Sequence, residues 1–147
     1  MGTITGLYFS YRLKMREESL RELTQVLREM ALLIRYRALP VKDLFSELSR
    51  YEFISNVGGA VGADFRGGWV TAADKLTELG EYERKVVKSV GLSLGTSDIE
   101  GQIGMLEVNA EILSKHSEEA HEQYVKKGNL YRIFGVLAGM FIAVLLI

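Results

Sequence analysis

The last eighteen residues, 130–147, constrain the fold of this chain more than any other stretch. They read LYRIFGVLAGMFIAVLLI, and no charged or strongly polar side chain occurs after Arg132. At about 1.5 Å of rise per residue such a helix spans roughly 27 Å, which suits a hydrocarbon core of roughly 30 Å. A helix buried in a soluble core is the alternative, but a chain of 147 residues rarely covers every face of one. We therefore expect residues 130–147 to form a transmembrane helix in contact with membrane lipid.

The composition suits one helical domain in front of that membrane segment. The chain has no cysteine and one proline, which excludes disulfides and favours helices. Its net charge of -1 gives no reason to expect a nucleic-acid partner. We predict an all-α fold, a compact bundle of five or six helices over residues 12–128, followed by the transmembrane helix.

The first eleven residues, MGTITGLYFSY, resemble the final third of a membrane helix more than a signal peptide. Arg12, Lys14 and Arg16 follow at once, and residues 126–132 carry three more basic side chains. Basic residues collect on the cytoplasmic side of membrane helices, so both flanks predict a cytoplasmic body. A disordered terminus explains residues 1–11 almost as well.

Residues 13–37 hold the clearest helix of the body. Its apolar positions step by three and four residues; they are Leu20, Leu23, Leu27, Met30 and Ile34. This stripe suits either a bundle core or the seam of a coiled coil. The bundle core is favoured because the repeat stops at Pro40, whereas a coiled-coil signalling adaptor would form a long parallel dimer.

Shorter helical stretches follow Pro40, which suits the first turn of a helix. In the stretch 49–68, three glycines between 58 and 62 weaken the helix, and Gly67 with Gly68 should end it. Gly95 should end the helix over residues 81–94. The stretches and their inward-facing residues are 41–51 (Leu44, Phe45, Leu48), 49–68 (Phe53, Ile54, Val57, Val61, Phe65), 69–79 (Trp69, Ala72, Ala73, Leu76) and 81–94 (Val86, Val87, Val90, Leu94).

A long helix should begin near Asp98 and run into the membrane. Ser97, with Glu100 three residues later, has the spacing of a capping box. Because little interrupts the pattern, we expect one continuous helix or a pair hinged at Gly128. Its apolar stripe consists of Ile103, Leu106, Ala110 and Leu113.

The patterns that suggest chemistry have simpler explanations. Residues 91–95 read GLSLG, but a nucleophile elbow needs a strand before its serine, and Ser93 falls at a helix end. Helix packing and termination explain the glycines better, so Ser93→Ala should change stability only slightly. His116 and His121 are five residues apart, which favours a solvated helix face over a metal site. With no phosphate-binding loop either, we predict no enzymatic activity, metal or cofactor.

Gly135 and Gly139 form a G-x-x-x-G pair inside the membrane segment. Small residues four apart let a second helix approach closely. The second helix could belong to another copy, to the N-terminal segment or to a different protein. A chance match is the alternative, because glycine is common in membrane helices.

Charge is uneven along the body, from +3 over residues 12–37 to -4 over residues 41–83. Either region could bind a protein partner, although a charged helix face is usually just solvated. The candidate residues are Arg21, Arg28 and Arg35 in the basic region and Asp64, Asp74, Glu78, Glu81 and Glu83 in the acidic region.

Three motifs are spread over most of the chain in a fixed order and spacing. They are LLIRYRALPV at 32–41, LGTSD at 94–98 with Gln102, and GNLYRIFGVLAG at 128–139. Together with the aromatic pair Phe65 and Trp69, they resemble the stage III sporulation protein AB family of spore-forming bacteria. Leu33 stands where that family usually has glutamate, and Val41 where it usually has leucine.

The resemblance implies a non-enzymatic membrane platform of the channel between mother cell and forespore, needed for endospore formation. The family's soluble domain is similar to the cytoplasmic domain of F-type platform proteins of type II secretion. The resemblance also implies the stage III sporulation protein AA ATPase and other channel proteins of that operon as partners, with possible self-association. It places the chain in the mother-cell or outer forespore membrane, with its body in the mother-cell cytoplasm.

The family normally begins with a complete N-terminal membrane helix, of which residues 1–11 supply only the end. Either the start is truncated or this member is anchored once.

Overall fold

The computed structural model describes residues 2–58 and 65–147, and every regular element in these ranges is a helix. This confirms the all-α bundle. The positions predicted at 59–64, including Val61 and Asp64, lie outside the described residues. The elements are α1 (Gly2–Arg37), α2 (Val41–Glu47), α3 (Glu52–Gly58), α4 (Phe65–Asp74), α5 (Glu81–Ser93) and α6 (Ile99–Leu146).

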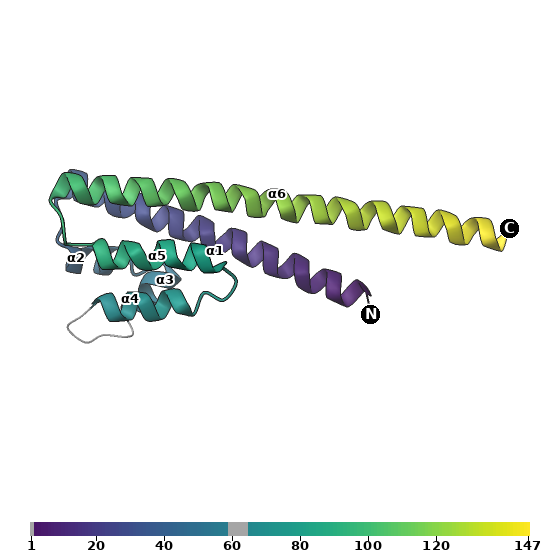
Figure 1. Ribbon diagram of the computed structural model, residues 1–147, viewed down its shortest axis with the longest axis horizontal. Helices are drawn as coiled ribbons and strands as arrows, with labels where there is room; N and C mark the ends of the chain where they lie inside the picture. The colour runs from purple at the N-terminus through teal and green to yellow at the C-terminus, as the bar shows by residue number, and fades with distance from the viewer. Residues whose placement is uncertain (1, 59–64) are drawn as a thin grey trace.

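Two long antiparallel helices, α1 and α6, form the axis of the molecule (Figure 1). The four shorter helices lie beside the half of α6 that is farther from its C-terminus, and α6 continues past the start of α1 (Figure 1). All five residues of the predicted α1 stripe are at most 4% exposed. The stripe is therefore a wall of the chain's own core and does not form the seam of a parallel coiled coil.

The beginning of α1 packs on α6 where the apolar segment of α6 starts. Gly6 is buried, and a Cβ atom there would overlap the ring of Tyr131. The ammonium nitrogen of Lys127 lies 4.8 Å from the ring centroid of Phe9. Residues 2–11 continue α1 without a break, so this segment and the body share one helix.

Asp98 begins α6, and its carboxylate accepts a hydrogen bond of 2.8 Å from the backbone N–H of Gly101. The capping box predicted for Ser97 and Glu100 is wrong, because the N-cap is one residue later. Gln102 bonds back to Gly95 and Ser97 and so ties the preceding turn to the helix. The helix then runs 48 residues without a hinge, about 72 Å at the usual rise. Its predicted stripe, from Ile103 to Leu113, is buried.

Trp69 is the centre of the smaller half of the core. Its indole N–H donates to the carbonyl of Val87 at 2.6 Å, and the ring of Phe53 meets it edge-on at 4.8 Å. A Cβ atom at Gly91 would overlap the indole ring, so α5 approaches α4 this closely only because residue 91 is glycine. Gly95 adopts a φ of 80° after the end of α5, as predicted for a helix stop.

Several predicted boundaries are wrong. Gly67 and Gly68 lie inside α4, because neither has the positive φ of a helix stop and Gly68 is buried against the core. The helix predicted over residues 69–79 is part of α4 and ends at Asp74, not at Leu79. The helix predicted over residues 41–51 is α2, which ends at Glu47. Pro40 is the N-cap of α2 instead of a residue of its first turn.

Replacing Gly91 with alanine should lower the free energy of unfolding by about 1–3 kcal/mol, because the new methyl group overlaps the buried Trp69 ring. Gly104→Ala is the matched control. No atom lies within 4 Å of a Cβ there, and alanine is a better helix former by about 1 kcal/mol. Chemical unfolding of the full chain in detergent micelles measures both. Equal stability of the two variants would contradict the packing.

Candidate interaction site

The basic row on α1 lies along the seam with α6. Arg35 pairs with Glu107 at 2.8 Å, and Arg28 lies 3.9 Å from Glu111, both on α6. Arg21 pairs with Glu17, one turn earlier on α1. The two pairs with α6 are exposed, and exposed pairs contribute about 0–1 kcal/mol each. Each of the three arginines predicted as candidate partner residues therefore already lies beside a carboxylate of the chain itself.

The described residues of the predicted acidic surface, Asp74, Glu78, Glu81 and Glu83, do not form one patch. Asp74 pairs with Lys88 of α5. Glu81 is exposed at the start of α5, whereas Glu83, two residues later, is buried. Glu78 lies between α4 and α5 and accepts a hydrogen bond from Ser19 of α1.

Glu83 joins three helices. Its side chain is 3% exposed and accepts two hydrogen bonds from Arg16 of α1, at 3.0 and 2.8 Å. The backbone N–H of Gly80 donates a third at 2.8 Å, and Nδ1 of His116 on α6 lies 3.0 Å from Oε2. Burial opposes ionisation of this carboxyl group. The hydrogen bonds from Arg16, Gly80 and His116, together with the positive charge of Arg16, outweigh the effect of burial. The pKa of Glu83 is therefore lower than its ordinary value of 4.5.

A second histidine makes a similar contact with α1. Nδ1 of His121 lies 3.0 Å from the carboxylate of Glu17, whose side chain is 8% exposed. The prediction of a solvated helix face is wrong for His116, whose side chain is 26% exposed and lies against the buried Glu83. His121 is exposed as predicted, although it also lies beside a carboxylate of a neighbouring helix. Their five-residue spacing directs them to different partners, Glu83 and Glu17. Within the described residues, no group of three or more side chains could hold a metal ion.

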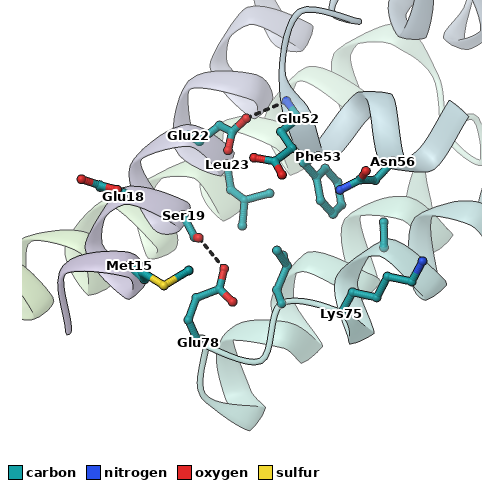
Figure 2. Close-up of a pocket in the computed structure, with 12 residues that line it drawn as sticks. Met15, Glu18, Ser19, Glu22, Leu23, Glu52, Phe53, Asn56, Lys75 and Glu78 are labelled. Carbon is teal, nitrogen blue, oxygen red and sulfur yellow. Dashed lines mark hydrogen bonds between the residues drawn. The ribbon is translucent and has the colours of Figure 1, made fainter. Parts of the chain in front are cut away.

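A groove with an apolar floor and an acidic rim separates α1, α3 and the end of α4 (Figure 2). Its volume is about 360 Å³. Two contacts cross it, from Ser19 to Glu78 and, at 2.9 Å, from the backbone N–H of Glu52 to the carboxylate of Glu22. Glu78 is the one lining residue that the sequence predicted as a candidate partner residue, because the walls come from residues 15–23, 52–56 and 72–78, which the fold brings together.

Every residue of α6 from Gly128 onward is exposed. In the described chain, α6 is the one helix long and apolar enough to cross a membrane. No atom lies within 4 Å of a Cβ built at Gly135 or Gly139, so in the described residues the N-terminal segment does not fill this pair. A close contact of these glycines with another membrane helix stays a prediction.

The stability that Glu83 contributes should be lost in acid. A lowered folded-state pKa stabilises the fold above the unfolded-state pKa, near 4.5, and this contribution disappears as pH falls through the folded-state value. Glu83→Gln should therefore lower the free energy of unfolding by about 2 kcal/mol at pH 7, since it leaves Arg16 with a weaker partner, and should flatten its acid dependence. Denaturant unfolding of the full chain in micelles from pH 7 to pH 3 measures this.

Glu81→Gln is the control for that experiment, because Glu81 is exposed two residues away on the same helix. It should keep the pH dependence of the unmodified chain. A Glu83→Gln variant with an unchanged acid slope would contradict the assignment.

The sequence model of one protein family, stage III sporulation protein AB, matches residues 1–147, the whole chain. No curated protein and no solved structure matches it. The family is not known as an enzyme family, and it indicates a role in sporulation. The apolar end of α6 is compatible with membrane association of such a protein. With the whole chain matched, and with the all-helical body and apolar α6 in place, this chain belongs to the stage III sporulation protein AB family.

Proposed function

We propose that this chain is a non-enzymatic membrane platform that couples the stage III sporulation protein AA ATPase to the channel between mother cell and forespore. The observation that carries the proposal is the continuity of α6. One helix of 48 residues contributes Ile103, Leu106 and Leu113 to the core of the body and ends in the apolar, exposed segment. A force on the body would reach the membrane segment through one uninterrupted set of helical hydrogen bonds.

The contacts beside α6 support such coupling. Glu83 ties α5 to α1 through Arg16 and to α6 through His116. Near the apolar segment, α1 packs on α6 again through Gly6 and Tyr131. The body is thus attached to α6 at several levels along its length, which limits independent rotation of α6.

Basic residues at the junction support a cytoplasmic body in the mother cell. Arg12, Lys127 and Arg132 lie near the start of the apolar segment, and basic residues favour the cytoplasmic side. In the proposed arrangement residues 130–147 lie in the mother-cell or outer forespore membrane, the start of α1 reaches the same membrane surface, and the other channel proteins of the operon meet the membrane segment. Gly135 and Gly139 would then pack against a second copy or another channel subunit.

The coupling predicts that a break in α6 separates binding from function. Asn129→Pro removes one helical hydrogen bond and costs about 3 kcal/mol locally, whereas Asn129→Ala keeps the helix. Asn129 is exposed between the body and the apolar segment. Both full-length variants in nanodiscs should bind the purified ATPase as the unmodified chain does, and only Asn129→Pro should reduce endospore yield, by at least tenfold.

Two outcomes would count against the proposal in different ways. Normal endospore yield with Asn129→Pro would mean that a continuous α6 is not needed. Absence of ATPase binding by the unmodified full chain in nanodiscs would mean that the ATPase is not its direct partner.

A further inference from the structure

We propose that a junction surface, formed by residues 7–14 of α1 and 124–132 of α6, lies in the headgroup layer of a membrane and binds anionic phospholipid. The inference rests on the proposed function in one respect, namely that residues 130–147 lie in a membrane. It goes beyond that function by giving the first turns of α1 a lipid ligand and by naming the class of that lipid.

The contacts between α1 and α6 place the start of α1 at the level where the apolar segment of α6 begins. Gly6 lies against the ring of Tyr131, and Phe9 lies beside the ammonium group of Lys127. Because the two helices are antiparallel, residues 7–11 lie beside the turns of α6 that come just before the apolar segment. At about 1.5 Å per residue they are within about 8 Å of the level of Tyr131, and the headgroup layer is about 5–8 Å thick. The start of α1 is therefore at headgroup depth when the apolar segment crosses the membrane.

The start of α1 exposes large apolar and aromatic side chains. Four of them are 50–67% exposed; they are Leu7, Tyr8, Phe9 and Tyr11. In the described chain the buried apolar stripe of α1 begins only at Leu20, so the core does not cover these four. Aromatic side chains gather at headgroup level, because an apolar ring with a polar edge suits the boundary between hydrocarbon and water. A membrane surface would therefore cover the side chains that the core leaves exposed.

The junction surface is basic and contains no acidic residue. Aspartate and glutamate are absent from residues 1–16 and 123–147, whereas five basic side chains lie on the junction surface; they are Arg12, Lys14, Lys126, Lys127 and Arg132. Basic residues elsewhere on the body, such as Lys85 and Lys115, have acidic residues within four positions in the sequence. Positive charge is thus unopposed along the sequence only at the level where the apolar segment begins.

Cations and aromatic rings of the two helices meet on this surface. The ammonium nitrogen of Lys127 lies 4.8 Å from the ring centroid of Phe9. The guanidinium group of Arg12 lies 5.9 Å from the ring centroid of Tyr8 and donates to the Tyr8 hydroxyl at 3.2 Å and to the carbonyl of Thr77 at 2.9 Å. The charge of Glu78 reaches Arg12 from the turn after α4, which leaves the lysines as the main ligands for lipid.

The excess of positive charge selects the lipid class. Long basic side chains can place their apolar stems beside hydrocarbon and their charges among lipid phosphates. Phosphatidylcholine has no net charge, so a surface with five basic and no acidic side chains favours anionic phospholipid.

The first test locates the junction surface relative to lipid, with tryptophan reporters in the full chain in phosphatidylcholine nanodiscs. Native Trp69 is buried in the core and gives a constant background. Leu7→Trp should lose at least half of its added fluorescence to lipid that carries bromine near the headgroup end of its acyl chains. Tyr36→Trp is the matched control, because Tyr36 is exposed at the other end of α1, and it should lose less than a tenth.

The second test measures the lipid class. Brominated phosphatidylglycerol, as a minor fraction of the bilayer, should quench Leu7→Trp at least twofold more than brominated phosphatidylcholine, and added salt should reduce the difference. Adding Lys126→Gln with Lys127→Gln should remove the difference, whereas the control pair Lys85→Gln with Lys115→Gln should keep it. Brominated phosphatidylcholine should still quench both variants, which shows that α1 remains folded at the membrane.

A third reporter, Phe134→Trp inside the apolar segment, separates this inference from the proposed function. If it is quenched and Leu7→Trp is not, the start of α1 does not reach lipid, and only the inference made here fails. If neither is quenched, residues 130–147 do not lie in a membrane, and the function proposed above fails as well.

Two further results would overturn the proposal. Equal quenching of Leu7→Trp by the two brominated lipids would contradict the assignment to anionic phospholipid. Shielding of Leu7→Trp from both brominated lipid and aqueous iodide would mean that a protein surface, of a second copy or of another chain, covers these side chains instead.

Discussion

The contact between α1 and α6 is the constraint on which the rest of the structure depends. Both helices bury an apolar stripe against the same core, and the shorter helices complete that core beside them. Because the pair is antiparallel, the start of α1 meets α6 just where its apolar segment begins, at Tyr131. The orientation of the body relative to the apolar segment of α6 is thus set by helix packing and not by a flexible linker.

The sequence was sufficient for the features that depend on local periodicity. The stripe of α1 and the φ of Gly95 follow from apolar spacing and glycine chemistry. For α6 the sequence predicted the start and the direction but left a hinge at Gly128 open, and the structure has one continuous helix. Boundaries that depend on packing were missed. Gly67 and Gly68 read as a helix stop, yet the contacts of Trp69 and its neighbours hold them in α4.

Polar contacts between distant residues were beyond sequence reasoning. Glu83 reads as one acid among eight in the middle region, and only the fold brings Arg16 and His116 to it. The groove was missed for the same reason, since its walls lie on α1, α3 and the end of α4. The arginine row shows the opposite error: it looked available in the sequence, but Arg28 and Arg35 face carboxylates of α6.

The central claim is that the body and the membrane segment move as one unit. The chain has no cysteine, so two can be introduced for spin labels without competition, at Lys85 on the exposed side of α5 and at Ile147. Pulsed electron paramagnetic resonance on the full chain in nanodiscs then measures the distance between them. A single narrow distance distribution is the predicted result, whereas a broad or two-peaked distribution would contradict rigid coupling through α6.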